Sequence, residues 1–242
     1  MDLAPRLDPR RCALFLDLDG TLAEIAPRPG DIGPDDRRTR ILRDLTEAMD
    51  GRIAVLTGRA LTDADRILEG AIVAVGATHG LERRAPDGGV VAHLPSRGLA
   101  QAKAELAALA GEIEGLHLED KGASIALHYR AIPHIERSVR AATRRLADVF
   151  GLQVQNGAMV SELRVPGPHK GDALTLYLAQ APFAGHTPVM VGDDLTDEHA
   201  FAAAAELGGY GVLVGPPRPS AARYRLASVG EVLAWLEAGS RA

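Results

Sequence analysis

The feature that most constrains the fold is the alternation of short apolar runs with segments of helical periodicity. Near the N-terminus the apolar runs are Ala13–Leu16, Ile53–Leu56 and Ile72–Val75. Their length and composition are typical of strands that are buried on both faces of a sheet. Apolar residues recur at helical spacing around Ile41, and again over Leu61–Leu68. Strand, helix and strand in this order require parallel pairing with right-handed crossovers, so the sequence predicts an α/β fold.

The same alternation returns near the C-terminus. It predicts helices over Ala173–Ala179 and Leu195–Ala205, and strands over Val189–Val191 and Gly211–Val214. A last helix follows Ser228, whose side chain is suited to capping it. We therefore expect both ends of the chain to build one doubly wound, Rossmann-like parallel sheet.

The middle of the chain follows a different pattern. It predicts a helix over Ala100–Ala110, a half-exposed strand over Ser124–Arg130, a helix from Ile135 to Val149, and short strands around Val154 and over Val160–Arg164. This order is typical of a small inserted α+β domain. We expect a core domain formed by residues 1–94 and 168–242, and an inserted cap domain over residues 95–167 that sets substrate specificity. The Pro-containing flanks, 93–96 and 166–168, are expected to act as hinges.

Composition excludes several classes of protein. The net charge is −5, and only 4 Phe, 4 Tyr and 1 Trp are present, which argues against a nucleic-acid partner. The one cysteine, Cys12, cannot form an intramolecular disulfide. The apolar run that begins there ends at Asp17, so it is too short for a membrane span or a signal peptide. We expect a cytoplasmic monomer that binds neither nucleic acid nor membrane.

Carboxylates follow two of the predicted strands directly. Asp17 and Asp19 come after the first strand, and Asp193 and Asp194 come after Val189–Val191. Ligands of open α/β sheets bind at this end of the strands. If the two strands are neighbours, Asp17 and Asp193 converge on an oxygen-rich site suited to Mg²⁺. The alternative for the first pair is a solvated acidic turn. The nearby Asp197 and Glu198, but not Asp193, are as readily explained as helix caps.

Two further segments supply groups that bind anions. Thr57, Gly58 and Arg59 follow the second predicted strand, and Lys170 opens the first helix after the inserted domain. A phosphomonoester carries a charge of roughly −2, so an acidic site needs such cations to accept it. Taken singly, a strand-end Thr-Gly or an exposed Lys is common, and only the combination indicates phosphate chemistry.

These segments resemble the four motifs of the haloacid dehalogenase superfamily of phosphohydrolases, in order and in position. The inserted domain looks like the α/β cap of its sugar phosphatases. More narrowly, four stretches resemble the trehalose-6-phosphate phosphatases: 76–82, 118–130, 162–167 and 191–201. Thr57 stands where that family commonly has Ser, and the roles of His169 and His199, which also depart from its pattern, are left open.

The resemblance implies a mechanism. Asp17 would attack phosphorus to form an aspartyl phosphate, and Asp19 would act as the general acid and base. Mg²⁺ would be held by Asp17, Asp193 and the carbonyl of Asp19, with Asp194 in support. Lys170 would hold the phosphate and aid catalysis, together with Thr57, Gly58 and Arg59. The substrate would also contact Leu18, between the two catalytic carboxylates.

The sugar would be bound by the inserted domain. In the resemblance, Glu119, Lys121, Arg130 and Glu162 match positions that hydrogen-bond glucose hydroxyls, and the reaction is hydrolysis of trehalose 6-phosphate to trehalose and phosphate. Two alternatives stay open. The nearer is a phosphatase of another phosphorylated sugar or glycoside, such as sucrose phosphate or mannosylglycerate phosphate. The other is a phospho-accepting receiver domain, against which Asp19 and the inserted domain argue.

Overall fold

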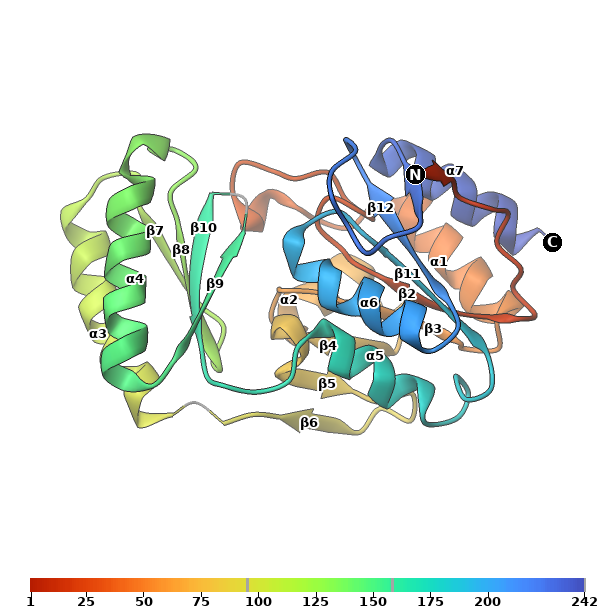
Figure 1. Ribbon diagram of the computed structural model, residues 1–242, viewed down its shortest axis with the longest axis horizontal. Helices are drawn as coiled ribbons and strands as arrows, with labels where there is room; N and C mark the ends of the chain where they lie inside the picture. The colour runs from red at the N-terminus through yellow and green to blue at the C-terminus, as the bar shows by residue number, and fades with distance from the viewer. Residues whose placement is uncertain (95, 158, 242) are drawn as a thin grey trace. The chain divides into compact units, whose positions relative to one another are not determined.

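The chain forms two compact units (Figure 1). The structure is a computed structural model that describes residues 1–94, 96–157 and 159–241. The first unit, here called the core unit, comprises Met1–Val91 and Pro168–Ala242, and the second, the insert unit, comprises Ala92–Gly167. Pro95, with which the predicted inserted domain begins, lies outside the described residues. No helix in the described ranges is long and apolar enough to cross a membrane.

A nine-stranded sheet forms the centre of the core unit. Its strands, in spatial order, are β1 (Asp2–Leu3), β13 (Tyr224–Leu226), β12 (Tyr210–Val214), β11 (Thr187–Gly192), β2 (Cys12–Leu16), β3 (Ile53–Leu56), β4 (Ala74–Ala77), β5 (Glu82–Arg84) and β6 (Val90–Ala92). Pairing is parallel from β1 through to β4, and β5 runs antiparallel to β4. The N-terminal strand β2 thus lies directly beside the C-terminal strand β11.

Helices cover both faces of this sheet. Leu14 and Leu16 belong to a core cluster shared with α1 (Asp36–Ala48), α2 (Leu61–Leu68) and α7 (Val229–Ser240). Ala13 and Phe15 belong to a second cluster, shared with α5 (Lys170–Leu178) and α6 (Glu198–Glu206), the two helices drawn in front of the sheet in Figure 1. Successive side chains of β2 therefore enter opposite layers, as expected for a strand buried on both faces. The doubly wound α/β prediction is confirmed.

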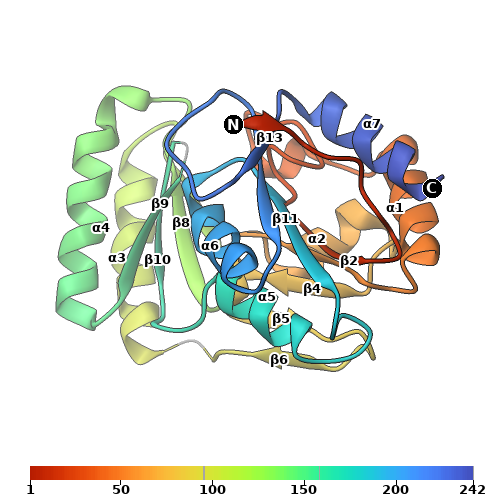
Figure 2. The same ribbon diagram turned by 45° about the vertical axis from the view of Figure 1, so that its right-hand side comes forward.

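The insert unit is a four-stranded antiparallel sheet with two helices on one face (Figure 2). Its strands lie in the order β7 (His117–Asp120), β8 (Ser124–His128), β10 (Val160–Arg164) and β9 (Gln153–Gly157), and its helices are α3 (Arg97–Glu112) and α4 (Glu136–Phe150). The hydroxyl of Ser161 lies 2.8 Å from that of Thr143 on α4, so Ser161 faces the helices. Side chains alternate along a strand, so Glu162 faces the opposite side.

Candidate active site

Two strand-end carboxylates lie side by side in the core unit. The backbone N–H of Asp17 donates to the carbonyl of Val191 at 2.9 Å, which extends the pairing of β2 with β11 by one residue. Asp193 therefore lies beside Asp17, and its carboxylate packs against Gly20. A Cβ at Gly20, which has a φ of +78°, would overlap Asp193 Oδ2. Glycine is required there both for its backbone conformation and for the close approach of Asp193.

Lys170 brings the positive charge to this pair. It is the first residue of α5, only 2% exposed, and its Nζ lies 2.8 Å from Asp17 Oδ1 and 2.7 Å from Asp197 Oδ1. Burial alone would lower the pKa of Lys170, but the two ion pairs outweigh it and raise that pKa above its ordinary value. Lys170 is thus a fixed cation next to Asp17.

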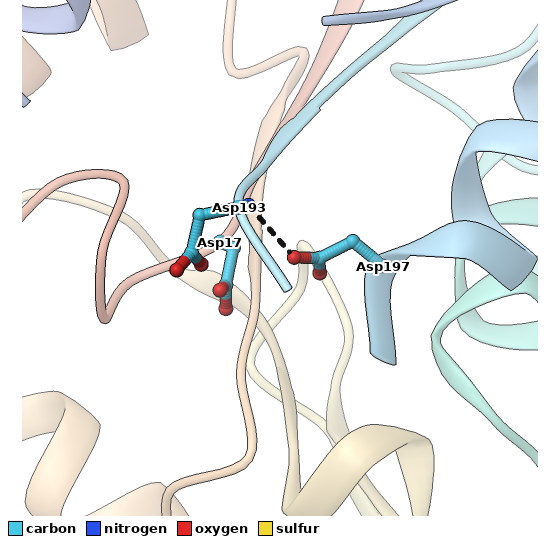
Figure 3. Close-up of side chains that lie close together, drawn as sticks. All are labelled: Asp17, Asp193 and Asp197. Atoms are coloured by element: carbon cyan, nitrogen blue, oxygen red, sulfur yellow. Dashed lines mark hydrogen bonds between the residues drawn. The ribbon is translucent and has the colours of Figure 1, made fainter. Parts of the chain in front are cut away.

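Asp197 is the member of the site that sequence reasoning treated only as a possible helix cap. It is fully buried, and its Oδ2 accepts the backbone N–H of Asp193 at 3.0 Å (Figure 3). The same oxygen accepts the backbone N–H of Asp194 at 3.1 Å. Asp197 closes a capping box with Asp194 around the short 3₁₀ helix at Leu195–Asp197. The three-residue spacing of Asp194 and Asp197 was the signal in the sequence, because a capping-box side chain reaches back across one turn.

The three carboxylates form a candidate cation site. Among the described residues, oxygen atoms of Asp17, Asp193 and Asp197 lie within 4.8 Å of one another, and Asp193 Oδ1 is buried without a hydrogen-bond partner. Burial and the charge of Asp197 raise the pKa of Asp17 well above its ordinary value. Burial, Asp197 and Asp194 raise the pKa of Asp193 to about 7. The cluster is therefore short of positive charge, and its hard oxygen donors fit Mg²⁺.

Asp194 begins the 3₁₀ helix that follows these carboxylates, and its support of the metal site stays a prediction. Its carboxylate accepts the backbone N–H of Leu195 at 2.6 Å, so it caps the 3₁₀ helix and is not among the three clustered carboxylates. Leu18, predicted to contact substrate, is fully buried in the hydrophobic core. Its carbonyl accepts the backbone N–H groups of Leu22 and Ala23, each at 2.9 Å. A contact of Leu18 with substrate stays a prediction.

Asp19 is held by Arg59 in a two-pronged ion pair. Arg59 Nε lies 2.8 Å from Asp19 Oδ2, and Nη2 lies 2.7 Å from Oδ1. Arg59 is 5% exposed, and it also contacts the carboxylate of Asp63 and donates to the carbonyl of Pro29 at 3.0 Å. This bidentate geometry fixes the plane of the Asp19 carboxylate. The sequence predicted that Arg59 binds phosphate, and that contact stays a prediction. In the structure Arg59 orients Asp19.

The loop after β3 is fixed by the segment that follows β4. Thr57 is fully buried, and its carbonyl accepts the N–H of His79 at 2.9 Å, while the carbonyl of Arg59 accepts the N–H of Thr78 at 2.8 Å. Thr78 and His79 have φ values of +47° and +56°. The His79 ring packs so closely on Gly58 that a Cβ there would lie 2.5 Å from it. The predicted phosphate loop is thus rigidly supported, by a histidine to which the sequence assigned no role.

His169 and His199, whose roles the sequence left open, stack on each other. Their ring centroids lie 4.4 Å apart at an interplanar angle of 13°. His169 is the N-cap of α5, and its Nδ1 accepts the N–H of Asp172 at 3.2 Å. The pair therefore fixes the start of the helix that carries Lys170.

In the insert unit, three of the four predicted sugar-binding residues lie together. Lys121 Nζ lies 2.9 Å from Glu162 Oε2 and 3.9 Å from Glu119 Oε2. Glu119 and Glu162 both pair in register with Ala126, on either side of β8, so they share a face of the sheet. Lys121 lies in the β7–β8 loop. The sequence predicted a strand that reaches Arg130, but β8 ends at His128, and Arg130 lies beyond it, exposed.

His128 was not predicted as part of this group. Its Nε2 lies 2.8 Å from Glu119 Oε2, and it is two residues from Ala126 on the same strand face. Burial opposes ionisation of Glu119, but its contacts with His128 and Lys121 outweigh burial and lower its pKa. The group is thus a compact set of hydrogen-bonding side chains suited to hydroxyl-rich ligands.

Comparison with known proteins agrees with this arrangement. The family model described as trehalose-phosphatase matches residues 15–229. The chain belongs to the trehalose-phosphatase family. It is 37% identical over 227 residues to trehalose-6-phosphate phosphatase of Escherichia coli (strain K12), covering 93% of this chain and 85% of that one. The resemblance inferred from the sequence is confirmed, and with it the assignment to the phosphoric monoester hydrolases.

Solved structures show the same fold. The C-terminal domain of trehalose-6-phosphate phosphatase from Candida albicans superposes with a TM-score of 0.83 at 22% identity, covering 97% of this chain and 93% of that one. A phosphatase of the haloalkanoate (HAD) enzyme superfamily from Bacteroides thetaiotaomicron gives a TM-score of 0.64 at 18% identity, covering 96% of each chain. At these identities the likeness concerns the fold, which is that of the HAD phosphatases.

Proposed function

We propose that this chain hydrolyses trehalose 6-phosphate to trehalose and phosphate through an aspartyl-phosphate intermediate, with Mg²⁺ as cofactor. The observation that carries the proposal is the placement of Asp17, buried at the end of β2 between the cation Lys170 and the carboxylate of Asp193. A buried carboxylate with an adjacent fixed cation is arranged to attack an anion, which an exposed acidic turn is not.

Two carboxylates divide the chemistry. Asp17 attacks phosphorus and forms an acyl phosphate as the bond from phosphorus to the sugar oxygen breaks, and Asp19 gives that oxygen its proton. Asp19 then takes a proton from the water that hydrolyses the acyl phosphate, which releases phosphate and restores Asp17. The ion pair with Arg59 orients the ionised Asp19 carboxylate, the form that takes the proton from water in the second step.

Asp17 and Asp193 would hold the Mg²⁺ ion, since Asp193 offers a buried oxygen that has no partner among the described residues. When bound, the ion supplies charge that screens the repulsion between Asp17 and the phosphate. Asp197 supports the site indirectly, because its two oxygens are engaged by Lys170 and by the amides of Asp193 and Asp194, the two residues here called the acidic loop. Lys170 and the loop Thr57–Arg59 stabilise the transferring oxygens.

Selection of the sugar would come from the insert unit. Phosphate chemistry does not distinguish leaving groups, and the insert unit carries Glu119, Lys121 and Glu162 as a polar group on one face of its sheet. Arg130 stays a predicted fourth contact. A phosphatase of another sugar phosphate or glycoside phosphate is the alternative, and it differs in what these side chains accept. A monomeric, cytoplasmic enzyme without nucleic-acid or membrane partners likewise stays our prediction.

The test is phosphate release from trehalose 6-phosphate beside glucose 6-phosphate and sucrose 6-phosphate. We expect trehalose 6-phosphate to be preferred by at least about tenfold in kcat/KM, equivalent to about 1.4 kcal/mol of transition-state binding. We also expect removal of Mg²⁺ by a chelator to abolish release, and added Mg²⁺ to restore it. A higher kcat/KM for another member of the panel would contradict the assigned substrate, and full activity in the chelator would contradict the metal site.

Glu162→Ala tests the role of the insert unit. The substitution should lower kcat/KM for trehalose 6-phosphate about tenfold or more, because each lost sugar hydrogen bond costs about 0.5 to 1.5 kcal/mol, and more where a charge is involved. Hydrolysis of para-nitrophenyl phosphate, which has no sugar, should change less than threefold. The control is Glu114→Ala, at an exposed position of the same unit, which should alter neither. Equal losses on both substrates would show that Glu162 acts on the core chemistry and not on the sugar.

A further inference from the structure

Arg218 lies in the loop between β12 and β13 and donates to the main chain of the acidic loop. Its Nη2 donates to the carbonyl of Asp194 at 2.9 Å and to that of Asp193 at 3.3 Å. Its Nη1 contacts the carboxylate of Glu198, the first residue of α6, and donates to the carbonyl of Pro219 at 3.2 Å. One guanidinium thus joins the acidic loop, the next helix and its own loop.

The peptide unit between Asp193 and Asp194 is consequently bound at both ends. Its N–H, which belongs to Asp194, donates to Asp197 Oδ2 at 3.1 Å, and its carbonyl, which belongs to Asp193, accepts from Arg218. A peptide unit fixed from both sides cannot rotate, and this one carries the side chain of Asp193. The backbone from which the Asp193 side chain projects is therefore held in place, and its buried Oδ1 has no hydrogen-bond partner in the described part of the chain.

Glu198 anchors Arg218 and is itself fully engaged. Its second oxygen accepts from Ser220 Oγ at 3.1 Å and from the N–H of Ala221 at 2.8 Å, and these contacts lower its pKa although burial opposes them. The Arg218 side chain is 24% exposed, so the contact with Glu198 alone would add little to stability. The contact matters because it holds the guanidinium within hydrogen-bond distance of the carbonyls of Asp193 and Asp194.

We propose that Arg218 is a positioning residue for the cation site: by bridging Glu198 and the carbonyls of the acidic loop, it presets Asp193 to bind Mg²⁺. The inference rests on the proposed metal site. Groups that orient a metal ligand without touching the metal typically change its affinity 10- to 100-fold. Arg218 also places a positive charge next to a run of acidic side chains, which reduces their mutual repulsion.

The test is calorimetric titration of Mg²⁺ into the full chain without substrate. Arg218→Met should raise the dissociation constant of Mg²⁺ about tenfold, while the melting temperature stays within about 3 °C of the wild type. Arg218→Lys keeps the positive charge but loses the planar guanidinium, whose separate N–H groups reach Glu198 and the carbonyls together. This variant should weaken Mg²⁺ binding to a similar extent. At saturating Mg²⁺, the KM for substrate should be unchanged in both variants.

Arg225→Met is the matched control. Arg225 Nη1 donates to the carbonyl of Gly215 at 2.8 Å, so it holds the same loop without touching the acidic loop. We expect its Mg²⁺ affinity to stay within twofold of the wild type. Wild-type affinity in Arg218→Met or in Arg218→Lys, or an equal loss in Arg225→Met, would overturn the bridging role. Absence of Mg²⁺ binding by the wild type would overturn the proposed metal site, and this inference with it.

Discussion

Asp17→Asn is expected to abolish turnover while leaving the protein folded. The amide has nearly the shape of the carboxylate, but it does not attack phosphorus and is a poor ligand for Mg²⁺. Loss of a covalent nucleophile typically costs several orders of magnitude, so we expect phosphate release to fall at least about 10⁴-fold. The measurement is initial rate at saturating trehalose 6-phosphate and Mg²⁺. Asp36→Asn, on the exposed first turn of α1, is the control and should be fully active.

The melting temperature of Asp17→Asn is a second measurement that tests the role of Asp17. Burial raises the pKa of Asp17 above its value in the unfolded chain, so at neutral pH the ionised carboxylate opposes folding of the metal-free protein. Replacing it by a neutral amide should leave the melting temperature in chelator equal to or above that of the wild type. In this variant the buried cation Lys170 is not left unpaired, because it still contacts Asp197. Residual turnover near the wild-type rate would exclude the covalent mechanism, and a lowered melting temperature would show that Asp17 stabilises the fold.

The central strands and helices could be predicted because each has a strong local pattern. Ile53–Leu56 and Leu61–Leu68 coincide with β3 and α2, since their apolar spacing is unambiguous and turn residues bound them. The strand predicted at Ile72–Val75 begins two residues later, at Ala74, because the apolar run continues through a turn. The short strands β1, β5, β6 and β13 were not predicted. They are two or three residues long and polar or exposed, so their pairing is decided by their neighbours and not by their own sequence.

The sequence could predict those site residues whose position follows directly from the end of a strand. Asp17 and Asp193 follow adjacent strands, so the topology alone brings them together. The partners of side chains were harder to predict. Arg59 lies in the right loop, but the sequence does not show that it binds Asp19, which lies forty positions away. Arg218 reads as part of a Pro-rich loop, and only the folded chain brings it to the acidic residues.

Lys170→Met is expected to reduce turnover about 10²- to 10³-fold, the scale for removal of one preorganised group that stabilises charge in the transition state. The structure adds a second consequence. Lys170 is buried between Asp17 and Asp197, so its removal leaves two carboxylates without their cation, and breaking a buried ion pair in this way costs about 3 to 5 kcal/mol. The single variant therefore changes activity and stability together.

A double variant separates the two effects. In Lys170→Met combined with Asp197→Asn, one unpaired charge is gone, and the oxygen of the introduced amide can still accept the backbone N–H groups that Asp197 accepts through Oδ2. We expect the melting temperature to recover toward that of the wild type while turnover stays as low as in Lys170→Met. Asp197→Asn alone is the reference for any effect of the second substitution. If turnover recovers together with stability, Lys170 only neutralises its neighbours, and stabilisation of the transferring phosphate must come from the loop Thr57–Arg59.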